Sequence, residues 1–299
     1  MTAPPPTAEE LPTALARLTA EANPGVVVTP RYRLRYFTWG PASDRPPVAF
    51  IHGMADRAQS FAMVMARLVD AGYRCVGYEL PNGSGDGANL GMYRHSHFSA
   101  DLLALLDHLS IDRADLFGSS FGSTIALRTA AQHPDRVRRV VLQGGFARRP
   151  LLRWERGLCR LGRYWPWRMS DLPFRVKEMD RLEGRHFRGG PPAAWRFLLA
   201  NSGATPCRAA ARRTLLIDTL DLRPRLAAVT APVLMLGGDD DTVVPRGCEA
   251  EVEAGLRDVR RVGFAGCGHY PQYTHPNGVA AAVADFLGQT GEPGAGATG

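Results

Sequence analysis

The stretch "DLFGSSFGSTIAL", residues 115–127, lies at the centre of the pattern that decides the fold. An apolar run ends at Gly118, two serines follow, and after Phe121 and Gly122 an apolar pattern with helical spacing resumes. The stretch therefore marks the point where a strand ends and a helix begins. Taken alone, it could be an ordinary turn, or it could hold one serine out of the sheet for chemistry.

Apolar runs rich in Val, Phe and Tyr alternate with helical segments on both sides of this stretch. The expected strands are residues 31–40, 46–53, 73–80, 114–120, 136–145, 231–238 and 259–266. The expected helices are residues 60–72, 97–110, 121–134, 246–256 and 276–289. This alternation predicts an α/β fold with a mostly parallel central sheet flanked by helices on both faces. Polar residues that follow such strands meet at one edge of the sheet.

The composition narrows the class of protein. Of the 299 residues, 45% are hydrophobic and 22% are charged, which is ordinary for a globular chain. No stretch approaches the roughly 20 apolar residues of a membrane span, and the first residues lack the pattern of a secretory signal. The five cysteines are scattered and form no CxxC pair, which favours reduced thiols in a cytoplasm over a disulfide framework or a zinc site. We therefore expect a cytoplasmic protein.

The segment from Gly118 to Gly122 has the form G-x-S-x-G. A serine at the tip of a tight strand-to-helix turn has strained backbone, and the residues two before and two after it must be small so that helix and strand can pack closely. By this register the exposed serine is Ser120, whereas Ser119 and Ser123 lie off the tip. Ser120 is therefore the candidate nucleophile.

A serine hydroxyl needs a base, and the base needs a group that orients it. The stretch "LMLGGDDDTVVP" (234–245) places three aspartates, Asp239 to Asp241, directly after an expected strand. The stretch "GFAGCGHYPQYTHP" (263–276) places His269 in the loop after the last strand. His275, just before Pro276, is expected to cap or precede the last helix.

Four segments in this order resemble the α/β-hydrolase superfamily: "FIHGM" (50–54), "GSSFGS" (118–123), "GGDDDTVVP" (237–245) and "GCGHYPQYTHP" (266–276). The resemblance is to the serine esterase and lipase-like branch, which carries a lid inserted after the sixth strand. It covers roughly residues 26–289 and is weakest in the insertion. It implies the α/β-hydrolase fold with a helical lid.

The resemblance also assigns roles to residues. Asp241 matches the family's acid because it lies four residues before the proline of a D-x-x-V-P element, with Asp239 and Asp240 as competitors. His269 matches the histidine of the family's Gly-His. The backbone N–H groups of Met54 and Phe121 would form the oxyanion hole.

These residues predict a serine hydrolase that cleaves a carboxylic ester through an acyl-enzyme. Epoxide hydrolases and haloalkane dehalogenases are similar in fold but have aspartate at the elbow, so Ser120 argues against them. A thioesterase, an acyltransferase, a carbon–carbon bond hydrolase or a perhydrolase would use the same elbow, and a hydrolase-fold binding protein could keep the residues with little turnover. No Walker A, H-E-x-x-H or clustered metal ligands appear, so no cofactor or metal is expected.

One segment departs from the family. Relatives commonly carry Asp-x-x-Gly-x-Gly-x-Ser after the fourth strand, and this chain has "ELPNGSGDGANLG" (79–91), with Glu79 in place of the acid. The departure leaves the shape of this loop open. Its glycines do not lead directly into a helix, so a nucleotide-binding loop is not expected.

The expected organisation has four parts. Residues 1–25 are a flexible, proline-rich N-terminal arm with room for one short helix, and residues 26–146 and 231–289 form the α/β-hydrolase core. Residues 147–230 form the helical lid and the return connection, and residues 290–299 form a disordered tail.

The expected lid is strongly basic. Residues 148–213 contain 16 basic and five acidic residues, a net charge of +11 against +7 for the whole chain. An apolar stripe with helical spacing predicts a helix that packs onto the body and leaves its arginines solvated. The stripe consists of Leu151, Trp154, Leu158, Leu161 and Trp165.

The alternative interpretation is that the basic charge attracts acidic or lipid-like acyl substrates, or holds the protein peripherally on an anionic lipid surface. A small-molecule acyl substrate is the expected partner. No recognition motif accompanies the charge, so nucleic acid is not expected.

Overall fold

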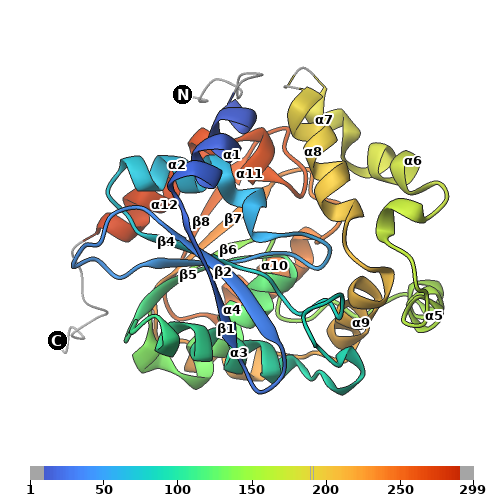
Figure 1. Ribbon diagram of the computed structural model, residues 1–299, viewed down its shortest axis with the longest axis horizontal. Helices are drawn as coiled ribbons and strands as arrows, with labels where there is room; N and C mark the ends of the chain where they lie inside the picture. The colour runs from blue at the N-terminus through green and yellow to red at the C-terminus, as the bar shows by residue number, and fades with distance from the viewer. Residues whose placement is uncertain (1–9, 189, 191, 290–299) are drawn as a thin grey trace.

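The computed structural model describes residues 10–188, 190 and 192–289. An eight-stranded sheet runs through it in the order β1-β2-β4-β3-β5-β6-β7-β8 (Figure 1). The β1–β2 and β2–β4 pairs are antiparallel and all other pairs are parallel, which confirms the expected mostly parallel sheet. The strands are β1 (Asn23–Val28), β2 (Arg33–Trp39), β3 (Val48–Ile51), β4 (Cys75–Tyr78), β5 (Ala114–Ser119), β6 (Val137–Gln143), β7 (Val233–Gly238) and β8 (Val259–Phe264).

Helices flank the sheet and also form an insertion between β6 and β7. The flanking helices are α1 (Glu10–Glu21), α2 (Ala62–Asp70), α3 (His95–His108), α4 (Phe121–Gln132), α10 (Arg246–Gly255), α11 (Pro271–Thr274) and α12 (Pro276–Gly288). The insertion contains α5 (Arg153–Gly162), α6 (Arg175–Met179), a π-helical turn (Asp180–Gly184), α7 (Arg185–Phe187), α8 (Pro192–Gly203) and α9 (Cys207–Asp218). His275 is the residue that precedes α12, as expected.

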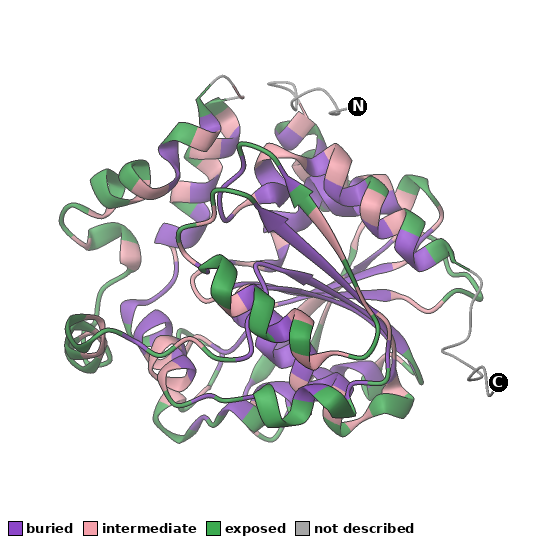
Figure 2. Ribbon diagram, turned by 180° about the vertical axis from the view of Figure 1, so that it is seen from behind, coloured by how far each residue is buried: buried purple, intermediate pink, exposed green. Residues whose placement is uncertain are grey.

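The central strands are buried on both faces (Figure 2). Successive side chains of a strand point to opposite faces, so the sheet has one core on each side. Leu116 and Leu142 belong to the core shared with α3 and α4, whereas Phe117 and Val141 belong to the core shared with α1, α2 and α12. The rings of Phe50 and Phe117 stack at 4.9 Å in the second core. The sheet is thus a rigid platform for the loops at its edge.

The N-terminal segment differs from the prediction. The expectation of a flexible arm over residues 1–25 is wrong from Glu10 onward, because α1 buries Leu11, Ala14 and Leu18 against α2 and β1 begins at Asn23. These three side chains recur at helical spacing, and Arg17 adds an ion pair with Asp70 of α2 at 2.9 Å. Residues 1–9 lie outside the described residues, as does the expected disordered tail, 290–299.

The insertion also differs from the prediction in one respect. Leu151 is buried, but Trp154 is 63% exposed, Leu158 61% and Leu161 71%, so the expectation that this stripe packs onto the body is wrong. Trp165, the last member of the stripe, is 40% exposed. Helix α5 packs instead on α9, another helix of the insertion. Among the described helices, none is long and apolar enough to cross a membrane.

The loop that departs from the family, residues 79–91, is organised around Asp86. The buried Asp86 carboxylate accepts hydrogen bonds from the backbone N–H groups of Asn82 at 2.7 Å, Gly83 at 3.3 Å and Ala88 at 3.0 Å. Glu79 accepts the backbone N–H of Ala58 at 3.1 Å, so it ties this loop to the segment after β3. Asp86 therefore fixes the conformation of this loop, which the sequence did not predict.

Candidate active site

Ser120 follows β5 and has φ 51° and ψ −115°, a positive-φ conformation that is rare for a residue with a side chain. Its backbone N–H donates to the carbonyl of Gln143 at 2.8 Å, and its carbonyl accepts the N–H of Ser123 at 2.9 Å. Neighbouring backbone therefore holds Ser120 in a strained turn from both sides. This is the geometry that the G-x-S-x-G spacing predicts.

The two glycines of the turn allow helix and strand to pack closely. A Cβ added at Gly118 would lie 2.5 Å from the carbonyl oxygen of Gly122, and a Cβ at Gly122 would overlap the carbonyl of Ile51. Both neighbours are backbone atoms, which cannot rotate away. Only glycine fits at either position.

Replacing Gly122 with alanine is expected to lower the free energy of unfolding by about 1–3 kcal/mol, because the added methyl forces α4 away from β3. Denaturant unfolding followed by circular dichroism measures the change. Gly247→Ala is the matched control, since a Cβ there meets nothing within 4 Å and helix α10 favours alanine. A Gly122→Ala protein as stable as the wild type would contradict the close packing.

The two neighbouring serines have structural partners. The Ser119 hydroxyl accepts a hydrogen bond from Gln143 Nε2 at 3.0 Å, inside a buried network that continues to Gln272. The Ser123 hydroxyl donates to the carbonyl of Ser120 at 2.6 Å. Both side chains are buried, whereas Ser120 is partly exposed. The structure therefore leaves Ser120 as the serine that a substrate could reach.

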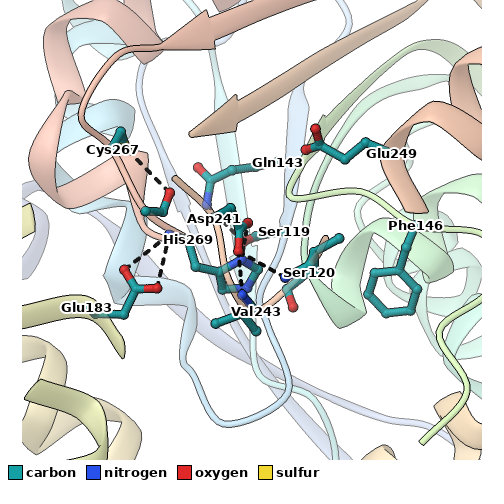
Figure 3. Close-up of polar contacts among 12 residues, drawn as sticks. Ser119, Ser120, Gln143, Phe146, Glu183, Asp241, Val243, Glu249, Cys267 and His269 are labelled. Atoms are coloured by element: carbon teal, nitrogen blue, oxygen red, sulfur yellow. Dashed lines mark hydrogen bonds and ion pairs between the residues drawn. The ribbon is translucent and has the colours of Figure 1, made fainter. Parts of the chain in front are cut away.

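His269 and Asp241 meet at the carboxyl edge of the sheet, from the loops that follow β8 and β7 (Figure 3). The distance between His269 Nδ1 and Asp241 Oδ2 is 2.7 Å, and both side chains are 5% exposed. An ionised carboxylate only accepts, so Nδ1 carries the proton and Nε2 presents its lone pair. That tautomer is the one a general base requires.

Backbone donors fix the other oxygen of Asp241. Oδ1 accepts the N–H groups of Val243 at 2.8 Å and Val244 at 2.9 Å. Burial acts to raise the pKa of Asp241. The charge and hydrogen bond of His269 and these two N–H groups act to lower it by more, so the net shift of the pKa is downward. Of the other two aspartates, Asp240 lies 3.7 Å from Arg185 in an exposed ion pair. The structure therefore brings Asp241 to His269.

Ser120 and His269 both adjoin the end of β6 (Figure 3). Ser120 is hydrogen-bonded to Gln143, and a Cβ added at the next residue, Gly144, would lie 2.8 Å from His269 Cε1 and 3.5 Å from Asp241 Oδ2. The three predicted residues thus converge around one glycine. A side chain at Gly144 would enter the space that the imidazole occupies.

The protonation of His269 follows from its surroundings. Burial lowers the pKa of His269, but the charge and hydrogen bond of Asp241, together with the charge of Glu183, raise it above its ordinary value. The imidazole must be neutral to accept a proton from a serine. Any reaction that uses it as a base therefore slows as the pH falls through this raised pKa.

His52 fixes the loop that carries Met54 through hydrogen bonds of both its ring nitrogens. The backbone N–H of Leu80 donates to His52 Nε2 at 3.0 Å, so Nδ1 carries the proton and donates to the carbonyl of Gly53 at 2.8 Å. Burial lowers the pKa of His52 to about 3, which keeps it neutral in this role. A Cβ added at Gly53 would lie 3.7 Å from Ser120 Cβ, so this loop adjoins the turn. Phe121 is buried as the first residue of α4.

Arg213, in α9, is a residue that sequence reasoning missed. Its guanidinium is 2% exposed and donates to the carbonyls of Met54 at 2.5 Å, Leu80 at 3.2 Å and Pro81 at 2.8 Å. Burial lowers its pKa to about 10, so it remains charged at neutral pH. It therefore fastens the Met54 loop to the insertion. Nothing local distinguishes it from the other arginines of its segment.

Glu183, in the π-helical turn of the insertion, was also missed. It is 1% exposed, and its two carboxylate oxygens accept the backbone N–H of His269 at 3.3 and 3.1 Å (Figure 3). The approach depends on Gly268, because a Cβ there would overlap the Glu183 carboxylate. Burial raises the pKa of Glu183 to about 7, although the charge and N–H of His269 act in the opposite direction. The insertion thus contacts the His269 loop with a titratable group.

Replacing Glu183 with glutamine is expected to move the acid limb of the kcat/KM profile to lower pH. Glutamine keeps an oxygen that can accept the His269 N–H but removes the charge that raises the pKa of His269. The pH dependence of ester hydrolysis measures the shift. Glu178→Gln is the control, because Glu178 is exposed and pairs with Arg181. An acid limb in the same place for both variants would show that Glu183 does not act on the imidazole.

In the part of the chain that the structure describes, no group of three or more His, Cys, Asp or Glu side chains could hold a metal ion.

Comparisons with known proteins agree with this fold. The family described as alpha/beta hydrolase fold matches residues 46–276. A 2-hydroxy-6-oxo-6-phenylhexa-2,4-dienoate hydrolase of Comamonas testosteroni is 26% identical over 267 residues, which cover 83% of this chain and 90% of that protein. The 3-oxoadipate enol-lactonase 2 of Acinetobacter baylyi is 27% identical over 228 residues, which cover 70% of this chain and 76% of that protein.

Solved structures are similar over most of the chain. The crystal structure of a hydrolase from Pseudomonas aeruginosa superposes with a TM-score of 0.79 and 22% identity, covering 89% of this chain and 99% of that one. The matched region of the family spans well over half of the sequence. The chain therefore belongs to the α/β hydrolase fold family, and its named relatives support a hydrolase.

Proposed function

We propose that this chain is a serine hydrolase that cleaves a carboxylic ester of a small molecule through an acyl-enzyme intermediate. The observation that carries the proposal is the 2.7 Å contact between His269 Nδ1 and Asp241 Oδ2, next to a serine held at φ 51°. A base oriented by a carboxylate beside a serine on a strained turn is the arrangement that activates a hydroxyl.

In the proposed reaction, His269 takes the Ser120 proton through Nε2 while Ser120 Oγ attacks the acyl carbonyl. Asp241 holds the imidazole and stabilises the imidazolium that forms. The backbone N–H groups of Met54 and Phe121 receive the oxyanion, and a donor of this kind is worth about 10²–10³ in rate. The proton on His269 passes to the leaving alcohol, and water then releases the acyl group by the same steps.

The insertion is proposed to act as the lid of this site. Three of its side chains contact the loops that carry the proposed catalytic groups. Glu183 accepts the N–H of His269, Arg213 binds the carbonyl of Met54, and Asn201 donates to the buried Asp56, two residues further on, at 2.6 Å. A movement of the insertion would therefore be transmitted to both sides of Ser120.

Labelling with a fluorophosphonate, followed by peptide mass spectrometry, tests the proposal together with turnover of p-nitrophenyl esters of increasing chain length. We expect rapid labelling on Ser120 and a burst of p-nitrophenol followed by steady turnover. Labelling without steady turnover would indicate a binding protein of this fold. Absence of both would overturn the proposal.

Carbon–carbon bond hydrolysis is the second candidate, since one relative is named a 2-hydroxy-6-oxo-6-phenylhexa-2,4-dienoate hydrolase. The other relative is named an enol-lactonase, and a lactone is a cyclic ester. Comparing kcat/KM for esters, lactones and 2-hydroxy-6-oxo-dienoates separates the two. A preference for the dienoate would replace the ester proposal.

A further inference from the structure

The insertion carries an exposed apolar face, which we define by Trp154, Leu158, Leu161, Tyr164, Trp165 and Trp167. Their side chains are between 40% and 74% exposed. Trp154, Leu158 and Leu161 recur at intervals of four and three residues, so they lie on one side of α5. Three of the five tryptophans of the chain are thus exposed. An exposed cluster of this kind marks a surface that binds something.

The opposite side of α5 is the one that is attached. Arg156 donates to both carboxylate oxygens of Asp218, at 2.6 and 2.9 Å. A Cβ added at Gly162 would lie 3.3 Å from the Cβ of Ala211, so the helix meets α9 closely there. Helix α9 of the insertion therefore holds α5 by a small and polar side, and the apolar face of α5 is exposed.

Basic side chains border the exposed apolar face. Arg153, Arg160, Arg163 and Arg168 are all exposed, and Arg153 and Arg160 are seven residues apart on one flank of α5. The whole segment 148–213 carries a net charge of +11. A helix with arginines beside tryptophans and leucines suits the boundary between lipid headgroups and acyl chains.

We propose that α5 and the segment that follows it dock on the surface of bilayers that contain anionic lipid. The apolar face enters the acyl boundary while the arginines meet the headgroups. Charge complementarity decides against a second copy as the occupant, because a two-fold contact through this face would bring the same arginines of both copies together. This docking does not depend on the activity proposed above.

Vesicle flotation tests the docking with the full chain. The probes are vesicles of phosphatidylcholine with about one third phosphatidylglycerol, and vesicles of phosphatidylcholine alone. We expect binding to the anionic vesicles, release at high salt, and a blue shift of tryptophan emission on binding. Ser120→Ala should bind like the wild type, which separates docking from catalysis.

Two sets of variants locate the docking surface. Each set is expected to lower partitioning of the protein onto anionic vesicles on the order of 100-fold. The first set combines Trp154→Ser, Leu158→Ser and Leu161→Ser. The second set combines Arg153→Gln, Arg160→Gln and Arg163→Gln. The control for the first set is Val28→Ser with Met92→Ser, which removes two apolar side chains that are 72% and 71% exposed outside the insertion. The control for the second set removes the same number of positive charges at exposed sites outside the insertion, by Arg33→Gln, Arg113→Gln and Arg257→Gln.

Both control sets should bind like the wild type, and the two docking sets and the two control sets should all hydrolyse a water-soluble ester at the wild-type rate. Equal binding to neutral vesicles, or no binding and no emission shift with anionic vesicles, would overturn the proposal. So would a solution dimer that the apolar triple variant converts to a monomer, since a second copy would then be the occupant.

Discussion

Replacing Ser120 with alanine is expected to lower kcat for ester hydrolysis by about 10⁵- to 10⁶-fold. The substitution removes the proposed nucleophile but keeps the Cβ, so the strained backbone at φ 51° costs the same in both proteins. Folding stability should therefore stay near that of the wild type. Steady-state turnover of a p-nitrophenyl ester, with thermal unfolding of each protein, measures both quantities.

Alanine at the two neighbouring serines provides the matched controls. Ser119→Ala removes the acceptor for Gln143, and Ser123→Ala removes the donor to the Ser120 carbonyl, so each is expected to cost about 1–2 kcal/mol of stability. Turnover should fall far less than in the Ser120 variant, because neither hydroxyl takes part in bond making. Loss of turnover in Ser119→Ala with retention in Ser120→Ala would mean that the nucleophile is misassigned.

The sequence predicts the strands β2 to β8 well because their signals are local, whereas β1 was not among the expected strands. Apolar runs end at glycine or at polar residues, and the turn at Ser120 is short enough for sterics to dictate its glycines. The meeting of Asp241 and His269 is predictable for a related reason. Both follow parallel strands, and the carboxyl ends of β7 and β8 lie at the same edge of the sheet.

The residues that sequence reasoning missed depend on contacts between distant segments. Glu183 reaches the His269 backbone across 86 positions, and only because residue 268 is a glycine. Arg213 reaches Met54 across 159 positions. A charged residue in a basic insertion carries no local sign of such a partner. Periodicity fails here because it describes one helix, not what the helix meets.

The orientation of α5 shows the same limit. Its spacing predicts an amphipathic helix, but the period is identical whether the apolar stripe faces the body or solvent. The choice is made by Asp218, which holds Arg156, and by the small residues at the α9 contact. Those residues lie on a different helix, so the spacing of the stripe alone could not predict that the apolar face of α5 is exposed.

Replacing Asp241 with asparagine is expected to lower kcat by about 10⁴-fold while leaving the fold intact. The asparagine oxygen can still accept the N–H groups of Val243 and Val244, which fixes the side chain in place. Its NH₂ group then faces His269 Nδ1 and must donate to it. The imidazole proton moves to Nε2, and the nitrogen that should receive the Ser120 proton no longer has a free lone pair.

Asp240→Asn makes the same chemical change one residue earlier and separates this tautomer effect from a loss of local charge. Asp240 pairs at 3.7 Å with the exposed Arg185, a contact that solvent screens, so its variant should keep nearly wild-type turnover. Burst kinetics with a p-nitrophenyl ester measure both variants, and thermal unfolding checks that each remains folded. Equal losses in the two would show that charge near the loop matters more than the tautomer. Turnover by Asp241→Asn within about tenfold of the wild type would remove Asp241 from the mechanism, because a misprotonated base cannot support that rate.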